Sequence, residues 1–192
     1  MSTAISTINL EKGQKIDLTK TNPGVLKYVV GLGWNPNTSA QADLDCSAFI
    51  LGENDKLLSE KHFVFYNNLN SPENSVVHTG DNTTGEGEGD DERINIDFSK
   101  IPEGARKIVF VVTIHKAQER NQNFGQVNGC YIRIMKDDEE KTQLLNYDLN
   151  EDYSVETAVE FGNLYLNNGE WKFQAMGTGS KEGLSHYVTK YQ

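Results

Sequence analysis

The sequence predicts an all-β protein: a two-sheet β-sandwich with one or two short helices, in a single domain over residues 1–192. Helical periodicity is almost absent, whereas short strand-like runs recur at regular spacing. Several of these runs, such as 108–114, are apolar on both faces, as expected for central strands of a two-sheet stack. No shift in composition and no linker divides the chain, which favours one domain.

The predicted elements follow in order along the chain. Strands are expected at 25–34, 43–51, 62–67, 93–98, 106–115, 129–136, 141–149, 157–167 and 170–177. Asn168 and Gly169 separate the last two strands, and this dipeptide favours a two-residue hairpin turn because both positions require positive φ. Two segments have helical character, the polar stretch 116–122 and the tail from about Lys181.

The charge of the chain excludes several classes of partner. The formal net charge is −10 at pH 7, whereas duplex nucleic acid is bound through lysine and arginine. The same charge argues against adsorption to an anionic membrane, and no segment has the roughly 20 apolar residues of a membrane-spanning helix. The first residues lack the basic start and apolar run of a secretory signal. We therefore expect a cytoplasmic protein that binds neither nucleic acid nor lipid directly.

One loop concentrates the negative charge. Residues 80–92 (GDNTTGEGEGDDE) contain six carboxylates and four glycines, and no lysine or arginine. Calcium takes roughly six to eight oxygen ligands, and glycines let a short backbone turn its carbonyls toward an ion. Without a cation the crowding is unfavourable, because two unit charges about 4 Å apart repel by about 1 kcal/mol even in bulk water. The loop therefore predicts a site for a divalent cation, with calcium favoured.

A second acidic element strengthens this prediction. Asp43 and Asp45 are two residues apart, so on a strand both side chains face one side while Leu44 faces the other. Asn67 and Asn68 close the strand expected at 62–67 and offer neutral oxygens. The prediction requires that these segments and the acidic loop meet at one end of the sandwich.

Other interpretations of the loop fit its spacing less well. Counted from Asp81, it has Thr83 and Gly85 at the third and fifth positions, where an EF-hand loop has acids or amides. Glu86 stands where a phosphate-binding loop has lysine, and residues 80–92 contain no histidine or cysteine to favour zinc. A merely solvated acidic loop stays open as an alternative, as does magnesium, which usually recruits fewer carboxylates.

The loop at 80–92 resembles the signature of the TerD family of tellurium-resistance proteins. The similarity extends over nearly the whole chain and includes GLGW at 31–34, DLDCSAF at 43–49, FYNN at 65–68, the stretch 108–127, YDLNED at 147–152, ETAVEFGNLY at 156–165 and GEWKFQAMGTG at 169–179. The resemblance implies a calcium-binding β-sandwich from a system that confers resistance to tellurite, phages and pore-forming colicins.

The resemblance also implies a ligand set and partners. It implies two calcium ions, and partners among other tellurium-resistance proteins in a complex peripheral to the inner membrane. The chain itself would act as a calcium-dependent interaction module. The ligands implied by position are Asp43, Asp45, Asp81, Glu86, Asp90, Asp91 and Glu92, together with Asn67.

Two other functions are alternatives to this one. Cys46 suggests a thiol-based redox protein acting on tellurite, although a single cysteine on a core strand is more often a small buried hydrophobe. A small-ligand binder for nucleotides is a further alternative, but the acidic loop offers no phosphate cradle. No histidine has an acid and a nucleophile at catalytic spacing, so we expect no enzyme.

Overall fold

The computed structural model describes residues 7–36, 42–80, 82–85, 89–138, 141–149 and 153–192. Two six-stranded sheets form the predicted sandwich. The first sheet has the order β1 (Ile8–Asn9), β10 (Gln143–Asp148), β9 (Asn128–Lys136), β3 (Lys27–Asn35), β7 (Glu92–Asp97), β6 (Val76–His78). The second has the order β2 (Lys15–Asp17), β12 (Glu170–Ser180), β11 (Ala158–Asn167), β8 (Lys107–Ile114), β4 (Leu44–Leu51), β5 (Phe63–Val64). Neighbouring strands are antiparallel except β1 and β10.

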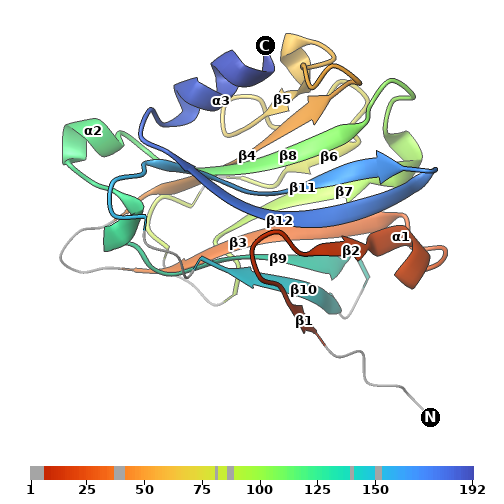
Figure 1. Cartoon of the computed structure of the whole chain (residues 1–192), viewed down its shortest axis with the longest axis horizontal. Helices are drawn as coiled ribbons and strands as arrows, with labels where there is room; N and C mark the ends of the chain where they lie inside the picture. Colours follow the sequence, from red (N-terminus) through yellow and green to blue (C-terminus); the bar gives the residue numbers. More distant parts are fainter. Residues whose placement is uncertain (1–6, 37–41, 81, 86–88, 139–140, 150–152) are drawn as a thin grey trace.

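The main core lies between the two sheets. Alternate residues of the central strands point into it, and Phe110 and Phe161 are fully buried there. A second, smaller core lies on the outer face of the second sheet, where the C-terminal helix α3 (Leu184–Tyr191) packs. Tyr187 and Tyr191 of α3 cover Val109 and Val111 of β8. This helix explains why β8 is apolar on both faces, and Figure 1 shows α3 lying alongside β4 and β8.

Most predicted elements are confirmed. The hairpin between β11 and β12 turns at Asn168 and Gly169, with φ of 54° and 80°. The strand expected at 62–67 is shorter, because the chain turns after β5 at Tyr66. The helix expected at 116–122 is reduced to α2 (Ala117–Arg120). The strands β1, β2 and β6 and the helix α1 (Leu18–Thr21) were not predicted.

Short 3₁₀ turns at Glu60–His62, Phe98–Lys100 and Phe124–Gln126 complete the connections. In the part of the chain that the structure describes, no helix has the length and hydropathy needed to cross a bilayer.

Candidate metal centre

Asp43 and Asp45 share one face, as their spacing predicted, and the structure shows that this is the outer face of the second sheet. Leu44, which lies between them, and Cys46, which follows Asp45, point into the main core. Both aspartates are nearly buried, at 7% and 5% exposure. The carboxylate Oδ2 of Asp45 lies 3.4 Å from His115 Nδ1. The strand therefore holds two carboxylates side by side at one end of the sandwich, largely shielded from solvent.

Arg120 and the backbone of His115 both contact Asp43. Arg120 on α2 places Nη1 3.9 Å from Asp43 Oδ2. The backbone N–H of His115 donates to the Asp43 carbonyl over 2.8 Å, which fixes the start of β4 against the end of β8. These contacts position the two aspartates by backbone pairing as well as by charge.

A pocket of about 500 Å³ opens beside Asp45. His115, Glu119 and Tyr66 contribute to its walls. The Tyr66 ring meets the His115 ring edge-on, with centroids 5.9 Å apart. This contact brings the turn after β5 to the same end of the sandwich, although Asn67 in that turn is exposed.

Glu92 joins the two sheets at the base of the acidic loop. It begins β7, is 1% exposed and points between the sheets. Its Oε2 accepts a hydrogen bond of 2.7 Å from the backbone N–H of Cys46 on β4. The same Oε2 lies 3.4 Å from His78 Nε2. Because His78 Nδ1 accepts from the Gly80 backbone N–H at 3.2 Å, the Nε2 of a neutral ring carries the proton and faces Glu92.

Asp91 holds the loop over Trp34. Its Oδ2 accepts from the Trp34 backbone N–H at 2.9 Å, and its Oδ1 accepts from Asn82 at 3.0 Å. The Trp34 indole N–H in turn donates to the Ala42 carbonyl at 3.2 Å, directly before the aspartate pair. Gly85 packs so closely on the indole that a Cβ there would overlap it.

The environment of Asp91 disfavours its negative charge. Burial raises the pKa of this carboxyl above its ordinary value, and the neighbouring charge of Asp90 adds to the rise, while the Trp34 N–H opposes it. A cation bound near Asp91 would act in the opposite direction and favour the carboxylate.

The Asp90 side chain contacts two arginines and a tyrosine. Arg133 Nε lies 2.6 Å and Arg93 Nε 3.1 Å from its carboxylate oxygens, and Tyr131 donates its hydroxyl at 3.3 Å. The carboxylate lies over Gly31, which leaves room because it has no Cβ. This position is on the outer face of the first sheet. Asp90 and the aspartate pair therefore lie on the outer faces of different sheets.

The described carboxylates form only part of the predicted ligand set. Asp81 and Glu86 lie outside the described residues. Within the described ranges, no three side chains of His, Cys, Asp or Glu converge as a metal site. The structure brings Asp43, Asp45 and Asp91 to one end of the sandwich, and their oxygen donors suit a hard cation such as calcium rather than zinc.

The two cysteines lie in the core. Cys46 and Cys130 are free thiols, 1% and 4% exposed. Burial raises the pKa of each thiol well above its ordinary value, and at Cys46 the nearby charge of Glu92 adds to the effect. Because the thiolate is the reactive species, this environment suits a structural cysteine better than a redox centre.

We expect both thiols to react with iodoacetamide at least about a hundredfold more slowly in the native protein than in urea-unfolded chain. Unfolded thiols ionise near the ordinary pKa of 9.0 while the native thiols stay protonated, so stability should also fall as pH rises above 9.0. Timed alkylation followed by mass spectrometry measures the rates. Native labelling as fast as unfolded labelling would contradict the burial of these groups.

The fold and site together define a class: a β-sandwich in which the end of a glycine- and acid-rich loop enters β7 near a buried aspartate pair. The chain belongs to the TerD family of tellurium-resistance and stress-response proteins, whose TerD domain matches residues 6–191.

Curated relatives and a solved structure agree with this family. The chain is 52% identical over 188 residues to general stress protein 16U of Bacillus subtilis (strain 168), covering 96% of this chain and 97% of that protein. It is 49% identical over 186 residues to tellurium resistance protein TerD of Serratia marcescens, with 96% of each chain covered. A crystal structure of a TerD homologue from Streptomyces coelicolor A3(2) superposes with a TM-score of 0.71 over 86% of this chain and 96% of that chain. At 18% identity it supports the fold alone.

Proposed function

We propose that this protein is a calcium-dependent interaction module of the tellurium-resistance and stress-response family. Calcium would bind where the acidic loop meets the aspartate pair of β4. The observation that carries this proposal is the direct link between the two elements, in which Glu92 Oε2 accepts from the Cys46 backbone N–H at 2.7 Å. Ordering of the loop by calcium would therefore also affect the core strand β4.

Different residues would have different parts in this site. Asp43, Asp45 and Asp91 would hold calcium together with Asp81 and Glu86 of the loop, in up to two sites. Bound calcium would supply positive charge that offsets the repulsion among these carboxylates. Glu92 would keep the loop attached to β4, and Asp90 would fix the loop to the first sheet through Arg93 and Arg133.

A module of this kind acts through what docks on its ordered surface. We infer that its partners are other tellurium-resistance proteins in a membrane-associated complex, and that it works in the cytoplasm as a non-enzymatic component. Two free, buried thiols are consistent with a reducing compartment.

Calcium should stabilise the folded protein. At about a hundred times its dissociation constant, a ligand of one native site adds about 2.7 kcal/mol to the free energy of unfolding. For a domain of this size that corresponds to a rise in Tm of roughly 5–11 °C. Thermal unfolding of chelator-stripped protein, with and without calcium, measures the shift. Magnesium at the same concentration is the control, and an equal shift with magnesium, or none with calcium, would contradict the proposal.

A further inference from the structure

A second pocket lies on the outer face of the second sheet, away from the acidic end. It has a volume of about 480 Å³, and β11, β12 and the end of α3 enclose it. Its floor includes Asn163, which pairs with Val109 of β8, four residues along the strand from the partner of Asp45. Four residues of strand span about 13 Å. The pocket is therefore separate from the proposed calcium site.

Four lysines surround this pocket: Lys15 from β2, Lys56 from the β4–β5 connection, Lys107 from β8 and Lys190 from α3. Among the residues that the structure describes, two carboxylates line it, Asp55 and Glu160. In a chain with a formal charge of −10, such a concentration of ammonium groups attracts anions locally while the rest of the surface repels them.

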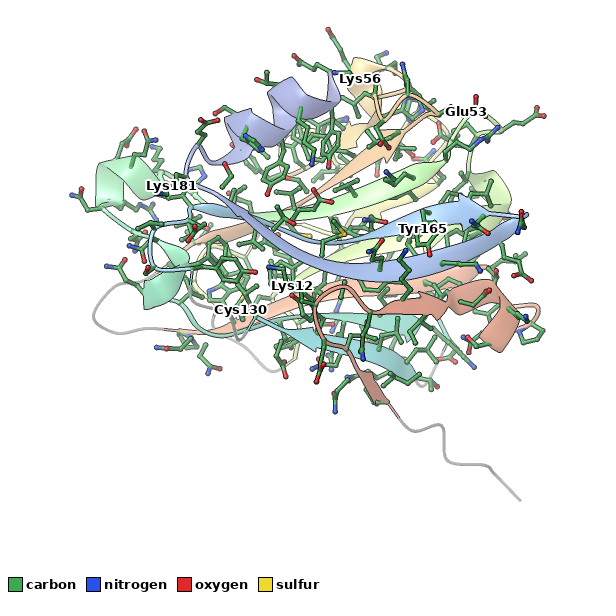
Figure 2. All side chains as sticks on the ribbon, in the orientation of Figure 1. Lys12, Glu53, Lys56, Cys130, Tyr165 and Lys181 are labelled. Atoms are coloured by element: carbon green, nitrogen blue, oxygen red, sulfur yellow. The ribbon has the colours of Figure 1, made fainter. Side chains whose placement is uncertain are left out.

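The lysines differ in how far their charges are already compensated. Lys107 lies 2.6 Å from Asp55, and Lys190 lies 3.1 Å from the nearly buried Glu160. Lys15 and Lys56 have no carboxylate within ion-pair distance among the described residues. Lys56 instead donates to the Lys190 carbonyl at 3.1 Å, and Figure 2 shows it beside the C-terminal end of α3. Two positive charges thus face the pocket without a balancing acid.

Aromatic rings hold two of these ammonium groups in place. Lys15 Nζ lies 5.8 Å from the centre of the Tyr165 ring, and Lys190 Nζ lies 4.8 Å from that of Tyr191. Cation–π contacts of this kind restrict a flexible lysine. Ordering the lysines beforehand lowers the entropy lost when an anion binds.

Asn163 gives the pocket a neutral polar group. It is 5% exposed, and its side chain makes no hydrogen bond within the described part of the chain. Gln174 lies directly opposite on β12 and also lines the pocket. Amide side chains both donate and accept hydrogen bonds, so these two residues can bind a ligand with hydroxyl or phosphate oxygens.

We propose that this pocket binds a small phosphomonoester. Its phosphate accepts charge-assisted hydrogen bonds from the lysines, and its hydroxylated body reaches Asn163. The volume of about 480 Å³ falls within the usual range of small-molecule sites. This site is independent of the calcium proposal, since it uses none of the same residues.

Calorimetric titration of the full-length, chelator-stripped protein with glycerol 3-phosphate tests this site. Inorganic phosphate in a second titration distinguishes a phosphate subsite from a site for the whole ester, and glycerol is the uncharged control. We expect glycerol 3-phosphate to bind with a dissociation constant of about 1 mM or tighter, inorganic phosphate more weakly, and glycerol not at all.

The variant Lys15→Gln/Lys56→Gln should weaken glycerol 3-phosphate binding at least about tenfold. Both side chains are exposed, so the fold should survive. The matched control Lys12→Gln/Lys181→Gln removes the same charge from exposed lysines outside the pocket, both labelled in Figure 2, and should bind normally. No binding up to about 10 mM, or an equal loss in both variants, would overturn the proposal. Calcium titrations of the same proteins should be unchanged.

Discussion

Glu92→Ala should lower the free energy of unfolding by about 3–5 kcal/mol, the usual cost of removing one partner from a buried charged contact. The substitution leaves the Cys46 backbone N–H and the imidazole of His78 buried without the carboxylate they face. It also removes the side chain that joins β7 of one sheet to β4 of the other. Urea denaturation in the presence of chelator measures the loss without any contribution from metal.

Two further variants make the Glu92 result specific. Glu92→Gln keeps an oxygen that can accept from Cys46, so its loss should be smaller than that of the alanine variant. Glu103→Ala removes an exposed carboxylate and should change stability by no more than about 0.5 kcal/mol. If Glu92→Ala cost no more than Glu103→Ala, the contact between the sheets would contribute nothing to stability.

Asp43→Asn/Asp45→Asn should weaken calcium binding at least about a hundredfold, since each lost carboxylate is expected to reduce the affinity about tenfold. The amides preserve shape, and removing two adjacent negative charges relieves repulsion. Stability in chelator should therefore be retained. Calorimetric titration of the variant with calcium measures the effect.

The charge-matched control for this pair is Asp137→Asn/Asp138→Asn. These aspartates lie in the connection after β9, where Asp137 pairs with Lys141, and they contact none of the proposed ligands that the structure describes. This variant should bind calcium as the parent protein does. Equal loss in both variants would mean that overall charge, rather than the β4 pair, governs the affinity.

The central strands were predictable because their hydrophobic runs are long. The short strands β1, β2 and β6 were not, since two or three residues at a sheet edge carry no readable alternation. The helix α3 was expected, but its role was not. It covers Phe49 and Val109, so the second apolar face of β8 reflects a helix rather than the stacked sheet alone.

At the candidate site, the face shared by Asp43 and Asp45 followed from the two-residue period of a strand. The directions of the Asp90, Asp91 and Glu92 side chains did not follow from the sequence, because consecutive residues that enter a strand point in different directions. Asp90 turns to two arginines on the outer face of one sheet, and Glu92 turns inward. The ligand set implied by the family resemblance includes all three.

His78 was also missed as a structural partner of Glu92. It lies two residues after Val76, on the same face of β6. The partner strand β7 had been predicted, but nothing in the sequence indicated that β6 exists or that it pairs with β7.

Calorimetric titration of the chelator-stripped protein with calcium measures directly whether the proposed site binds the ion. We expect saturable binding with a dissociation constant of about 1 μM or tighter, and much weaker binding of magnesium under the same conditions. Absence of heat with calcium, supported by an unchanged Tm, would show that the loop at 80–92 is only solvated negative charge.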